Sequence, residues 1–273
     1  MRVLCRVAGQ WVDDWPATDR GLQYGDGLFE TMRLARGDVP LWQFHAERLQ
    51  QGLKALLFPA DSFHVIADAM GELADIVPLE QYSAAKLLVS RGSGQRGYAL
   101  PDHPDINLQV QLMQAPGWLH ERYPQGICTG INPVRLSQQP LLAGIKHLNR
   151  LEQVLARAEF ACDWQESVML DQQGWVVEGC YSNLYASIDG QWVTPVLQQC
   201  GVNGVIRRWL LSHGFVAEMP LSCDELFAAD AVALSNSLNG IAAVRSIDVI
   251  DFNMRHPALD GLKRMQQTLE TLF

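Results

Sequence analysis

Lys146 occupies a stretch of sequence that could turn an ordinary amine into a reactive one. It is one of only four lysines in the chain, and it lies in the apolar segment Leu141–Asn149, just before an amphipathic stretch. A lysine in such a segment is expected to be partly buried, which lowers its pKa and leaves a neutral, nucleophilic amine. A solvated lysine near a helix start would have a similar local sequence, so the residue alone leaves both interpretations open.

Glu178 is a carboxylate in an equally apolar setting. It ends the strand-like run Trp175–Glu178, and a second apolar run begins near Asn183. A carboxylate between two apolar strands needs a partner. A protonated ring nitrogen of a bound molecule would serve, and so would the side chain of an arginine.

The segment Gly201–Gly204 could bind an anion. It runs directly into Val205–Leu211, which we predict to be helical, so free backbone N–H groups at that helix start could hold a phosphate. An ordinary turn before a helix would have the same composition. A lysine, a carboxylate and a phosphate site are together the groups that a pyridoxal phosphate (PLP) enzyme requires.

A second glycine-rich segment matches a nucleotide-binding motif, but in the wrong context. Gly92, Gly94 and Gly97 spell G-x-G-x-x-G after a predicted strand. A dinucleotide site needs such a loop to lead directly into a helix, whereas Pro101 and Pro104 follow here and prevent one. We therefore expect no dinucleotide site.

Hydrophobic periodicity predicts the strands and helices that carry these residues. In the first part of the chain we expect strands at 1–12, Tyr24–Leu34, Ala84–Ser90 and Ile106–Gln114, and helices at Trp42–Leu57 and Ser62–Ile76. Farther along we expect a strand at Ile127–Leu136, a helix face formed by Leu148, Leu151, Leu155 and Ala158, strands at Ser167–Leu170 and Trp175–Glu178, and an Asp189-Gly190 hairpin that joins Asn183–Ile188 to Gln191–Thr194.

The pattern breaks at Ala115–Gly117, where we place a domain boundary. The prediction is a two-domain α+β chain with an N-terminal α/β domain at 1–114, a linker at 115–126 and a C-terminal domain at 127–273. Both domains would be of ordinary size.

The composition argues against several classes of function. Apolar residues make up 48% of the chain and charged residues 19%, as in globular proteins. The net charge is -9, and there is no basic block that could follow a nucleic-acid backbone. Without a membrane-length apolar run or a signal-peptide core, we expect a cytoplasmic protein and no membrane partner. The six cysteines are scattered, so we expect neither disulfides nor a metal.

The run from Glu178 to Arg207 resembles the signature of the class IV aminotransferases, also called fold-type IV PLP enzymes. Trp192 is the one departure, because the signature has an aliphatic residue at its place. The resemblance extends over nearly the whole chain. The matching positions are Glu178, Cys180, Asn183, Leu184, Tyr185, Thr194, Val202, Gly204, Val205 and Arg207.

This resemblance implies a fold, a cofactor and an assembly. The N-terminal domain would be a two-layer α/β sandwich and the C-terminal domain an α/β barrel-like unit, with PLP bound between them. A homodimer is expected, in which the partner subunit supplies part of the wall of the site.

The resemblance also assigns roles to individual residues. Lys146 matches the catalytic lysine that binds PLP, and Glu178 matches the carboxylate that faces the pyridine nitrogen. Arg48 matches the phosphate-binding arginine of an H-x-x-R-L stretch, here His45–Leu49. The other cofactor contacts would come from Val205, Ile206, Ser237 and Leu238.

Within the family, the resemblance favours a lyase subgroup. The segments that carry it are Ala17–Gly27, Ser90–Tyr98 and Leu142–Leu155. Such an enzyme removes a proton from the amine-bearing carbon of a cyclic dicarboxylate and releases pyruvate and an aromatic amine.

Five residues are candidates for contact with that substrate. Arg91 and Arg96 could bind its carboxylates because arginine offers a planar fork of donors. Either arginine, and Arg91 in particular, could instead be structural. Tyr24, Phe29 and Thr31 lie on the strand that resembles the family's substrate wall, and they could equally be core residues.

Two alternatives remain open. A D-amino-acid or branched-chain aminotransferase would share Lys146, Glu178 and Arg48 but return the proton to the cofactor instead of expelling a leaving group. A non-catalytic binding module could keep the fold, although it would have no need to retain Lys146.

Overall fold

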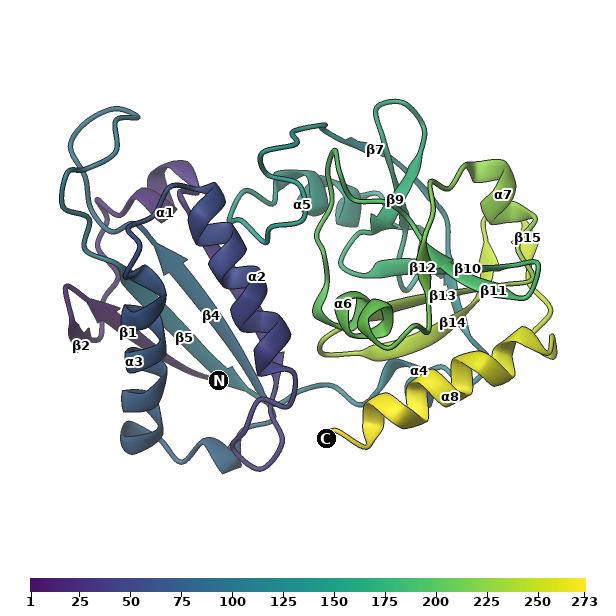
Figure 1. Ribbon diagram of the computed structural model, residues 1–273, viewed down its shortest axis with the longest axis horizontal. Coiled ribbons are helices and arrows are strands. Elements are labelled where there is room, and N and C mark those ends of the chain that lie inside the picture. Colours follow the sequence, from purple (N-terminus) through teal and green to yellow (C-terminus); the bar gives the residue numbers. More distant parts are fainter. The chain divides into compact units, whose positions relative to one another are not determined.

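The computed structural model describes residues 1–273 and divides the chain into two compact units (Figure 1). Unit 1 contains Met1–Ala115 and the short segment Ile145–Asn149. Unit 2 contains Pro116–Gly144 and Arg150–Phe273. Strands and helices occur in both units, so the two-domain α+β prediction is confirmed. None of the helices combines the length and the apolar character needed to cross a membrane.

Unit 1 is built on a five-stranded antiparallel sheet with the order β2-β1-β5-β4-β3. The strands are β1 (Arg2–Val7), β2 (Gln10–Val12), β3 (Gly27–Arg33), β4 (Ala84–Ser90) and β5 (Asn107–Met113). The helices are α1 (Arg20–Tyr24), α2 (Trp42–Ala55) and α3 (Ser62–Ile76), with a 3-10 turn at Leu79–Gln81. α2 and α3 lie side by side on one face of the sheet (Figure 1).

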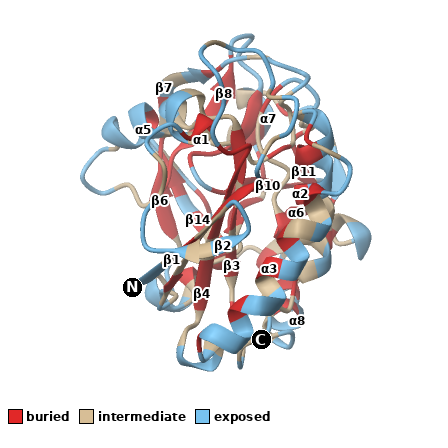
Figure 2. Cartoon of the chain, turned by 90° about the vertical axis from the view of Figure 1, so that its left-hand side faces the viewer, coloured by how far each residue is buried: buried red, intermediate tan, exposed pale blue.

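Alternation along β3 separates a covered face from a more open one. Leu28 and Glu30 are buried, whereas Phe29 and Thr31 are half-buried on the other side. The covered face packs tightly against α2, because a Cβ at Gly52 would come within 2.7 Å of the Leu28 methyl carbons. The helix α3 shows the same division, with buried and exposed sides along its length (Figure 2).

Unit 2 contains two sheets. The larger has the order β12-β11-β10-β13-β14-β15 with β6 added beside β14, and the smaller has the order β7-β8-β9. The strands are β6 (Ile127–Thr129), β7 (Ile131–Leu136), β8 (Val168–Asp171), β9 (Val176–Gly179), β10 (Asn183–Ile188), β11 (Gln191–Thr194), β12 (Ala217–Glu218), β13 (Ala231–Asn236), β14 (Gly240–Ile247) and β15 (Ile250–Asp251). The helices are α4 (Leu119–Arg122), α5 (Leu151–Ala158), α6 (Val205–Ser212), α7 (Cys223–Phe227) and α8 (Ala258–Glu270).

The predicted hairpin between β10 and β11 is confirmed. Asp189 and Gly190 have φ angles of 50° and 76°, the left-handed values that a two-residue type I′ turn requires. The core beneath this hairpin is apolar and continuous through the larger sheet, with Leu184, Val232 and Val244 fully buried. Four of the signature residues therefore lie on β10 and β11 of the larger sheet: Asn183, Leu184, Tyr185 and Thr194.

Three predicted strands were too long. The run 1–12 is two strands joined at Ala8-Gly9, both with positive φ, and Tyr24 ends α1 instead of starting β3. Ile127–Leu136 breaks at Gly130 into strands of different sheets. The indole of Trp164 packs against Gly130 so closely that a Cβ there would lie 1.7 Å from the ring, so only glycine fits at the break.

The middle of the chain also differs from the prediction. The helix expected from Leu148 begins only at Leu151, because Leu148 is hydrogen-bonded to β3. Ile145–Asn149, which we expected in the C-terminal domain, lies in unit 1. The stretch 115–126, expected to be a linker, contains α4. Periodicity did not reveal these features because they arise from contacts between distant segments.

Candidate active site

Lys146 lies on a short segment that pairs with the edge strand of unit 1. The N–H of Phe29 donates to the carbonyl of Lys146 at 2.9 Å, and the N–H of Leu148 donates to the carbonyl of Gly27 at 3.0 Å. The half-buried Lys146 side chain places Nζ 4.4 Å from the centroid of the Phe29 ring, a cation–π distance. The sheet therefore fixes the main chain of Lys146, and the Phe29 ring lies beside its amine.

A second lysine contacts the same ring. Lys86 Nζ lies 5.3 Å from the Phe29 centroid, and Lys86 is directly opposite Thr31 in the pairing of β3 with β4. Lys86 was not predicted as a site residue. Its only signal is the period-two pattern of β4, which puts it on the Phe29 face once the strand register is known.

Arg48 belongs to a buried cluster with Glu30 and His45. Arg48 donates to Glu30 through Nε at 2.8 Å and through Nη2 at 2.5 Å, and His45 Nδ1 lies 2.6 Å from a Glu30 oxygen. All three side chains are nearly inaccessible to solvent. One turn of α2 separates His45 from Arg48, so both reach the same strand residue. Glu30 was not predicted as a site residue, because nothing in the neighbouring sequence indicates the partner of a carboxylate on a strand.

The charges of this cluster are strongly coupled. Burial alone would raise the pKa of Glu30, but Arg48 and His45 outweigh it and lower the pKa to about 2. Burial lowers the pKa of His45 below its usual value, although Glu30 opposes this, and the charges of Arg48 and Lys146 lower it further. The cluster therefore pairs an ionised Glu30 with a cationic Arg48 at neutral pH.

Glu178 is buried near the end of β9. It is 4% exposed, and its Oε2 accepts a hydrogen bond from the N–H of Val202 at 2.9 Å. Burial lowers the pKa of Arg150 below its usual value, and the nearby negative charge of Glu178 opposes this shift only in part. Glu178 is thus tied to the glycine loop that precedes α6.

The side chain of Asn183 holds the loop before α6 through two hydrogen bonds. The Asn183 side chain donates to the Val202 carbonyl at 2.8 Å and accepts from the N–H of Gly204 at 2.9 Å. A Cβ at Gly204 would lie 2.0 Å from Asn183 Oδ1, so only glycine fits. α6 then begins without a side-chain cap, which leaves the N–H groups of Val205 and Ile206 without intrahelical acceptors.

Ser237 and Leu238 lie in the tight turn between β13 and β14. The N–H of Leu238 donates to Asn236 Oδ1 at 3.1 Å, and that of Asn239 donates to the same atom at 2.9 Å. Asn236 therefore shapes this turn, as Asn183 shapes the loop before α6.

A second buried carboxyl, Glu166, lies behind the turn that follows Glu178. Glu166 Oε1 accepts from the N–H of Ser167 at 2.9 Å, and Oε2 accepts from the N–H of Tyr181 at 3.3 Å. Burial raises the pKa of Glu166 to about 8, and these hydrogen bonds offset the effect only in part. Glu166 is therefore largely a neutral acid at pH 7.

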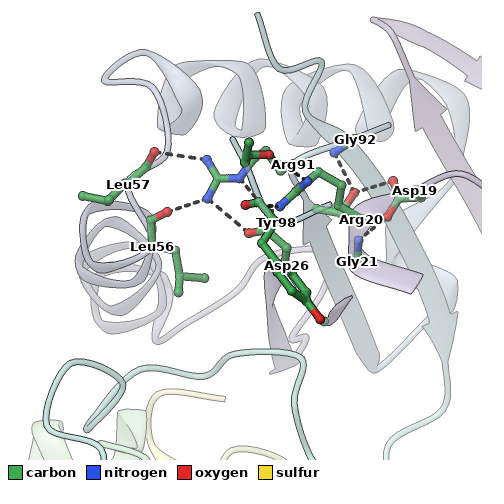
Figure 3. Close-up of polar contacts among 12 residues, drawn as sticks. Asp19, Arg20, Gly21, Asp26, Leu56, Leu57, Arg91, Gly92 and Tyr98 are labelled. Atoms are coloured by element: carbon green, nitrogen blue, oxygen red, sulfur yellow. Dashed lines mark hydrogen bonds and ion pairs between the residues drawn. The ribbon is translucent and has the colours of Figure 1, made fainter. Parts of the chain in front are cut away.

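Arg91 has structural partners (Figure 3). It is 2% exposed and donates to Asp26 through Nε at 2.9 Å and Nη2 at 3.1 Å. It also donates to the carbonyls of Leu56 and Leu57 at 2.5 and 3.0 Å and stacks over the Phe58 ring. These contacts favour the structural alternative for Arg91 over binding of a substrate carboxylate.

The remaining substrate candidates lie on three elements. Phe29 and Thr31 are on β3, whereas Tyr24 ends α1 and contacts the ring of Tyr98 edge-on at 5.4 Å. Arg96 is exposed on the glycine-rich loop. In unit 1 the structure therefore brings Phe29 and Lys146 together and presents Arg96 to solvent.

Comparison with known proteins identifies the family of the chain. The family model for class IV amino-transferases matches residues 27–247, which include both Lys146 and Glu178. The chain belongs to this family. Its members use PLP, as the resemblance implied.

Three relatives of the chain illustrate the range of this family. An aminodeoxychorismate lyase of Vibrio harveyi is 35% identical over 96% of this chain and 99% of that protein. The crystal structure of 4-amino-4-deoxychorismate lyase from Pseudomonas aeruginosa has a TM-score of 0.88 and 37% identity, covering 98% of this chain and 100% of that one. A putative branched-chain-amino-acid aminotransferase of Methanocaldococcus jannaschii is 30% identical over 88% of this chain and 86% of its own length.

The residues present in this member of the class IV family fit PLP. An uncapped helix start with buried Val205 and Ile206 suits a phosphate. The buried Glu178 has the charge that a protonated pyridine nitrogen needs, and Lys146 supplies an amine. By contrast Arg207, which also matches the family signature, is buried against Glu218 and Asn203 at 2.5 and 2.8 Å, so its role is structural.

Proposed function

We propose that this chain is an aminodeoxychorismate lyase, which uses PLP to convert 4-amino-4-deoxychorismate to 4-aminobenzoate and pyruvate. The observation that carries the proposal is the full-length similarity to the Pseudomonas aeruginosa lyase, with 37% identity and a TM-score of 0.88. The curated lyase of Vibrio harveyi supports it independently. Aminotransferase relatives match less well, at 30% identity or lower.

Lys146 is the residue to which we assign proton transfer. Bound PLP supplies an electron sink for the carbon that loses its proton. Lys146 would hold PLP through its amine, and its Nζ would be the group that takes the proton from the amine-bearing carbon of the substrate. The hydrogen bonds from Phe29 and Leu148 and the contact with the Phe29 ring limit the positions that Nζ can adopt. The C–O bond to the enolpyruvyl group would then break, the leaving enolpyruvate would take up a proton and become pyruvate, and aromatisation of the ring would make this release favourable.

Glu178 would keep the pyridine nitrogen protonated. A buried carboxylate stabilises a nearby proton on nitrogen because the interior screens the charges weakly. The N–H of Val202 orients this carboxylate and connects it to the loop before α6. We assign the phosphate to that helix start, through Val205 and Ile206.

The other phosphate contacts in this proposal come from Arg48 and from the turn of Ser237 and Leu238. Glu30 fixes the plane of the Arg48 guanidinium through two hydrogen bonds. An arginine held in one orientation binds phosphate with less loss of side-chain entropy.

The substrate carries two carboxylates, so the site needs cationic partners for them. We assign one to Arg96 and add Lys86 as a second candidate, because it lies against Phe29 and opposite Thr31. Phe29 and Thr31 would line the substrate ring. Tyr24 would act indirectly, through its contact with Tyr98.

An aminotransferase is the second candidate function, because a putative branched-chain enzyme matches 88% of the chain. It would use the same Lys146 and Glu178 and return the proton to the cofactor. A homodimer and a cytoplasmic location are further proposals that follow from the family resemblance.

The deciding experiment is a product assay on the purified, PLP-loaded protein. Enzymatically generated aminodeoxychorismate is added, and 4-aminobenzoate fluorescence and pyruvate are followed together, with Lys146→Ala as the control. Equimolar products that vanish in the control are expected. Absence of 4-aminobenzoate, combined with keto acid formation from D-alanine or a branched-chain amino acid, would replace the lyase with an aminotransferase.

A further inference from the structure

The glycine-rich loop Gly92–Leu100 is clamped by a buried arginine. Arg20, at the start of α1, is 3% exposed and reaches the loop with its guanidinium. We propose that Arg20 is a positioning residue: it fixes the conformation of this loop and thereby orients Arg96 to bind a carboxylate of the substrate. The part of this inference that concerns substrate rests on the proposed lyase function.

Arg20 donates hydrogen bonds to three consecutive carbonyl groups of the loop. Its Nη1 donates to the carbonyls of Gly97 and Ala99 at 3.3 and 3.1 Å, and its Nη2 donates to that of Tyr98 at 3.4 Å. These carbonyls immediately follow Arg96, so the chain direction on leaving that residue is set by the clamp. The planar fork of arginine suits several acceptors at once, which a lysine ammonium on a flexible stem does not.

Asp26 anchors the other side of the clamp. Its Oδ2 accepts from Arg20 Nε at 2.8 Å and from Arg91 Nε at 2.9 Å, as Figure 3 shows. Burial would raise the pKa of Asp26, but the hydrogen bonds from Arg91 and Arg20 outweigh it and lower the pKa. Since Arg91 is held by the carbonyls of Leu56 and Leu57, the anchor extends to the end of α2.

The three glycines of the G-x-G-x-x-G motif allow the loop to adopt the conformation that Arg20 holds. Gly92 has a φ of 79°, and a Cβ there would lie 1.9 Å from the carbonyl oxygen of Asp105. A Cβ at Gly94 would lie 3.0 Å from Arg20 Cδ, so glycine leaves room for the arginine stem. Gly97, with a φ of 99°, turns the chain toward Arg20. The motif therefore shapes a loop around an arginine instead of around a nucleotide.

The base of the loop is fixed independently of the Arg20 side chain. Asp19 accepts hydrogen bonds from Ser90 Oγ at 2.6 Å and from Asn107 Nδ2 at 2.8 Å, and the backbone N–H of Arg20 donates to Gly92 at 2.9 Å. At the tip, Arg96 is exposed and Tyr98 is 85% exposed. Loss of the Arg20 guanidinium should therefore loosen the tip and leave the base in place.

A loosened tip would weaken carboxylate binding without changing the chemical step. A flexible arginine loses conformational entropy when it binds a substrate, which weakens binding. In a loop that is already ordered in the folded protein, this loss on binding is smaller. The KM for aminodeoxychorismate should therefore rise in Arg20 variants while kcat changes little. A residue that supported the fold alone would lower the amount of active enzyme and leave KM unchanged.

The test is limited trypsin digestion of PLP-loaded protein, followed by mass spectrometry of the Arg96–Gly97 bond. In Arg20→Gln and Arg20→Lys we expect cleavage at this bond to be roughly tenfold faster than in the wild type, because local opening exposes it. Arg6→Gln, which removes a partly exposed pair with Glu72 in the same unit, is the matched control and should cleave at the wild-type rate. Arg20→Lys keeps a positive charge beside Asp26, so this variant should stay folded. Circular dichroism would show whether either variant has unfolded.

Kinetics on the same variants separate the two parts of the proposal, which are the ordering of the loop by Arg20 and the binding of substrate by Arg96. Arg20→Lys and Arg96→Gln should each raise KM, and the double variant should be little worse than Arg96→Gln alone. Unchanged cleavage in folded Arg20 variants would overturn the clamp. Faster cleavage with an unchanged KM would refute the role in substrate binding. If the wild type itself releases no 4-aminobenzoate, the lyase proposal falls, and the role in substrate binding falls with it; the digestion still decides the clamp.

Discussion

Glu30 and Arg48 form a bidentate pair across the interface of β3 and α2, with N–O distances of 2.8 and 2.5 Å. Both side chains are almost completely buried. The pair couples the strand beside Lys146 to the helix that carries the proposed phosphate arginine. Its geometry explains why a carboxylate stands in a strand whose other inward-facing neighbours are apolar.

Removal of Glu30 should be strongly destabilising. Glu30→Ala leaves the Arg48 charge buried without its carboxylate, and the loss of one partner of a buried pair costs about 3–5 kcal/mol. Chemical denaturation would measure this. Glu72→Ala, which breaks a partly exposed pair with Arg6, should change the free energy of unfolding far less, because solvent screens that pair. Equal losses in both variants would contradict the assignment.

The same pair predicts acid sensitivity. The pKa of Glu30 is lowered from 4.5 to about 2, so the stabilisation from its ionised form is complete above pH 4.5 and is lost as pH falls toward 2. Unfolding free energies measured between pH 5 and pH 2, in the wild type and in Glu30→Gln, should converge at the acid end. Parallel curves would show that Glu30 does not titrate in this range.

Glu166 should have the opposite effect. Its pKa is raised from 4.5 to about 8, so the unfolded chain loses this proton first and the free energy of unfolding falls as pH rises from 4.5 toward 8. Glu166→Gln should flatten the stability curve across this window. If its slope matched that of the wild type, the carboxyl would have to be ionised already in the folded protein.

The glycine before α6 should be essential for cofactor binding. A methyl group at Gly204 would collide with Asn183 Oδ1, so Gly204→Ala should displace the helix start and raise the PLP dissociation constant at least tenfold, or about 1.4 kcal/mol. Equilibrium titration of the apoprotein with PLP would measure this. Gly71→Ala in α3 is the control, because nothing lies within 4 Å of the new methyl group and PLP binding should be unchanged.

Sequence was most informative where a function depends on a short, continuous motif. Lys146, Glu178 and the Gly201–Gly204 loop could be named as candidates because each is recognisable from its neighbours in the chain, and their role in binding the cofactor is a proposal. The strand and helix spans of Ser62–Ile76 and Ala84–Ser90 were predicted to the residue, since local periodicity decides them. Neither span carries a residue that decides the proposed cofactor site, so local periodicity predicts the fold better than it predicts the site.

Other features depend on contacts between distant residues and have no local signal. Arg20 reaches a carbonyl 77 residues away, and Glu30 reaches its arginine 18 residues along the chain. Lys86 became a candidate only through strand register. Ile145–Asn149 joins unit 1 because its backbone pairs with β3, which no pattern in the segment itself indicates.

The most direct test of the central claim is to find the lysine that carries the cofactor. Two amines, those of Lys146 and Lys86, contact the Phe29 ring at 4.4 and 5.3 Å. Borohydride reduction of the PLP-loaded protein, followed by peptide mapping, should place the pyridoxyl label on Lys146, and Lys146→Ala should remain unlabelled. A label on Lys86, or none on the wild type, would contradict the account.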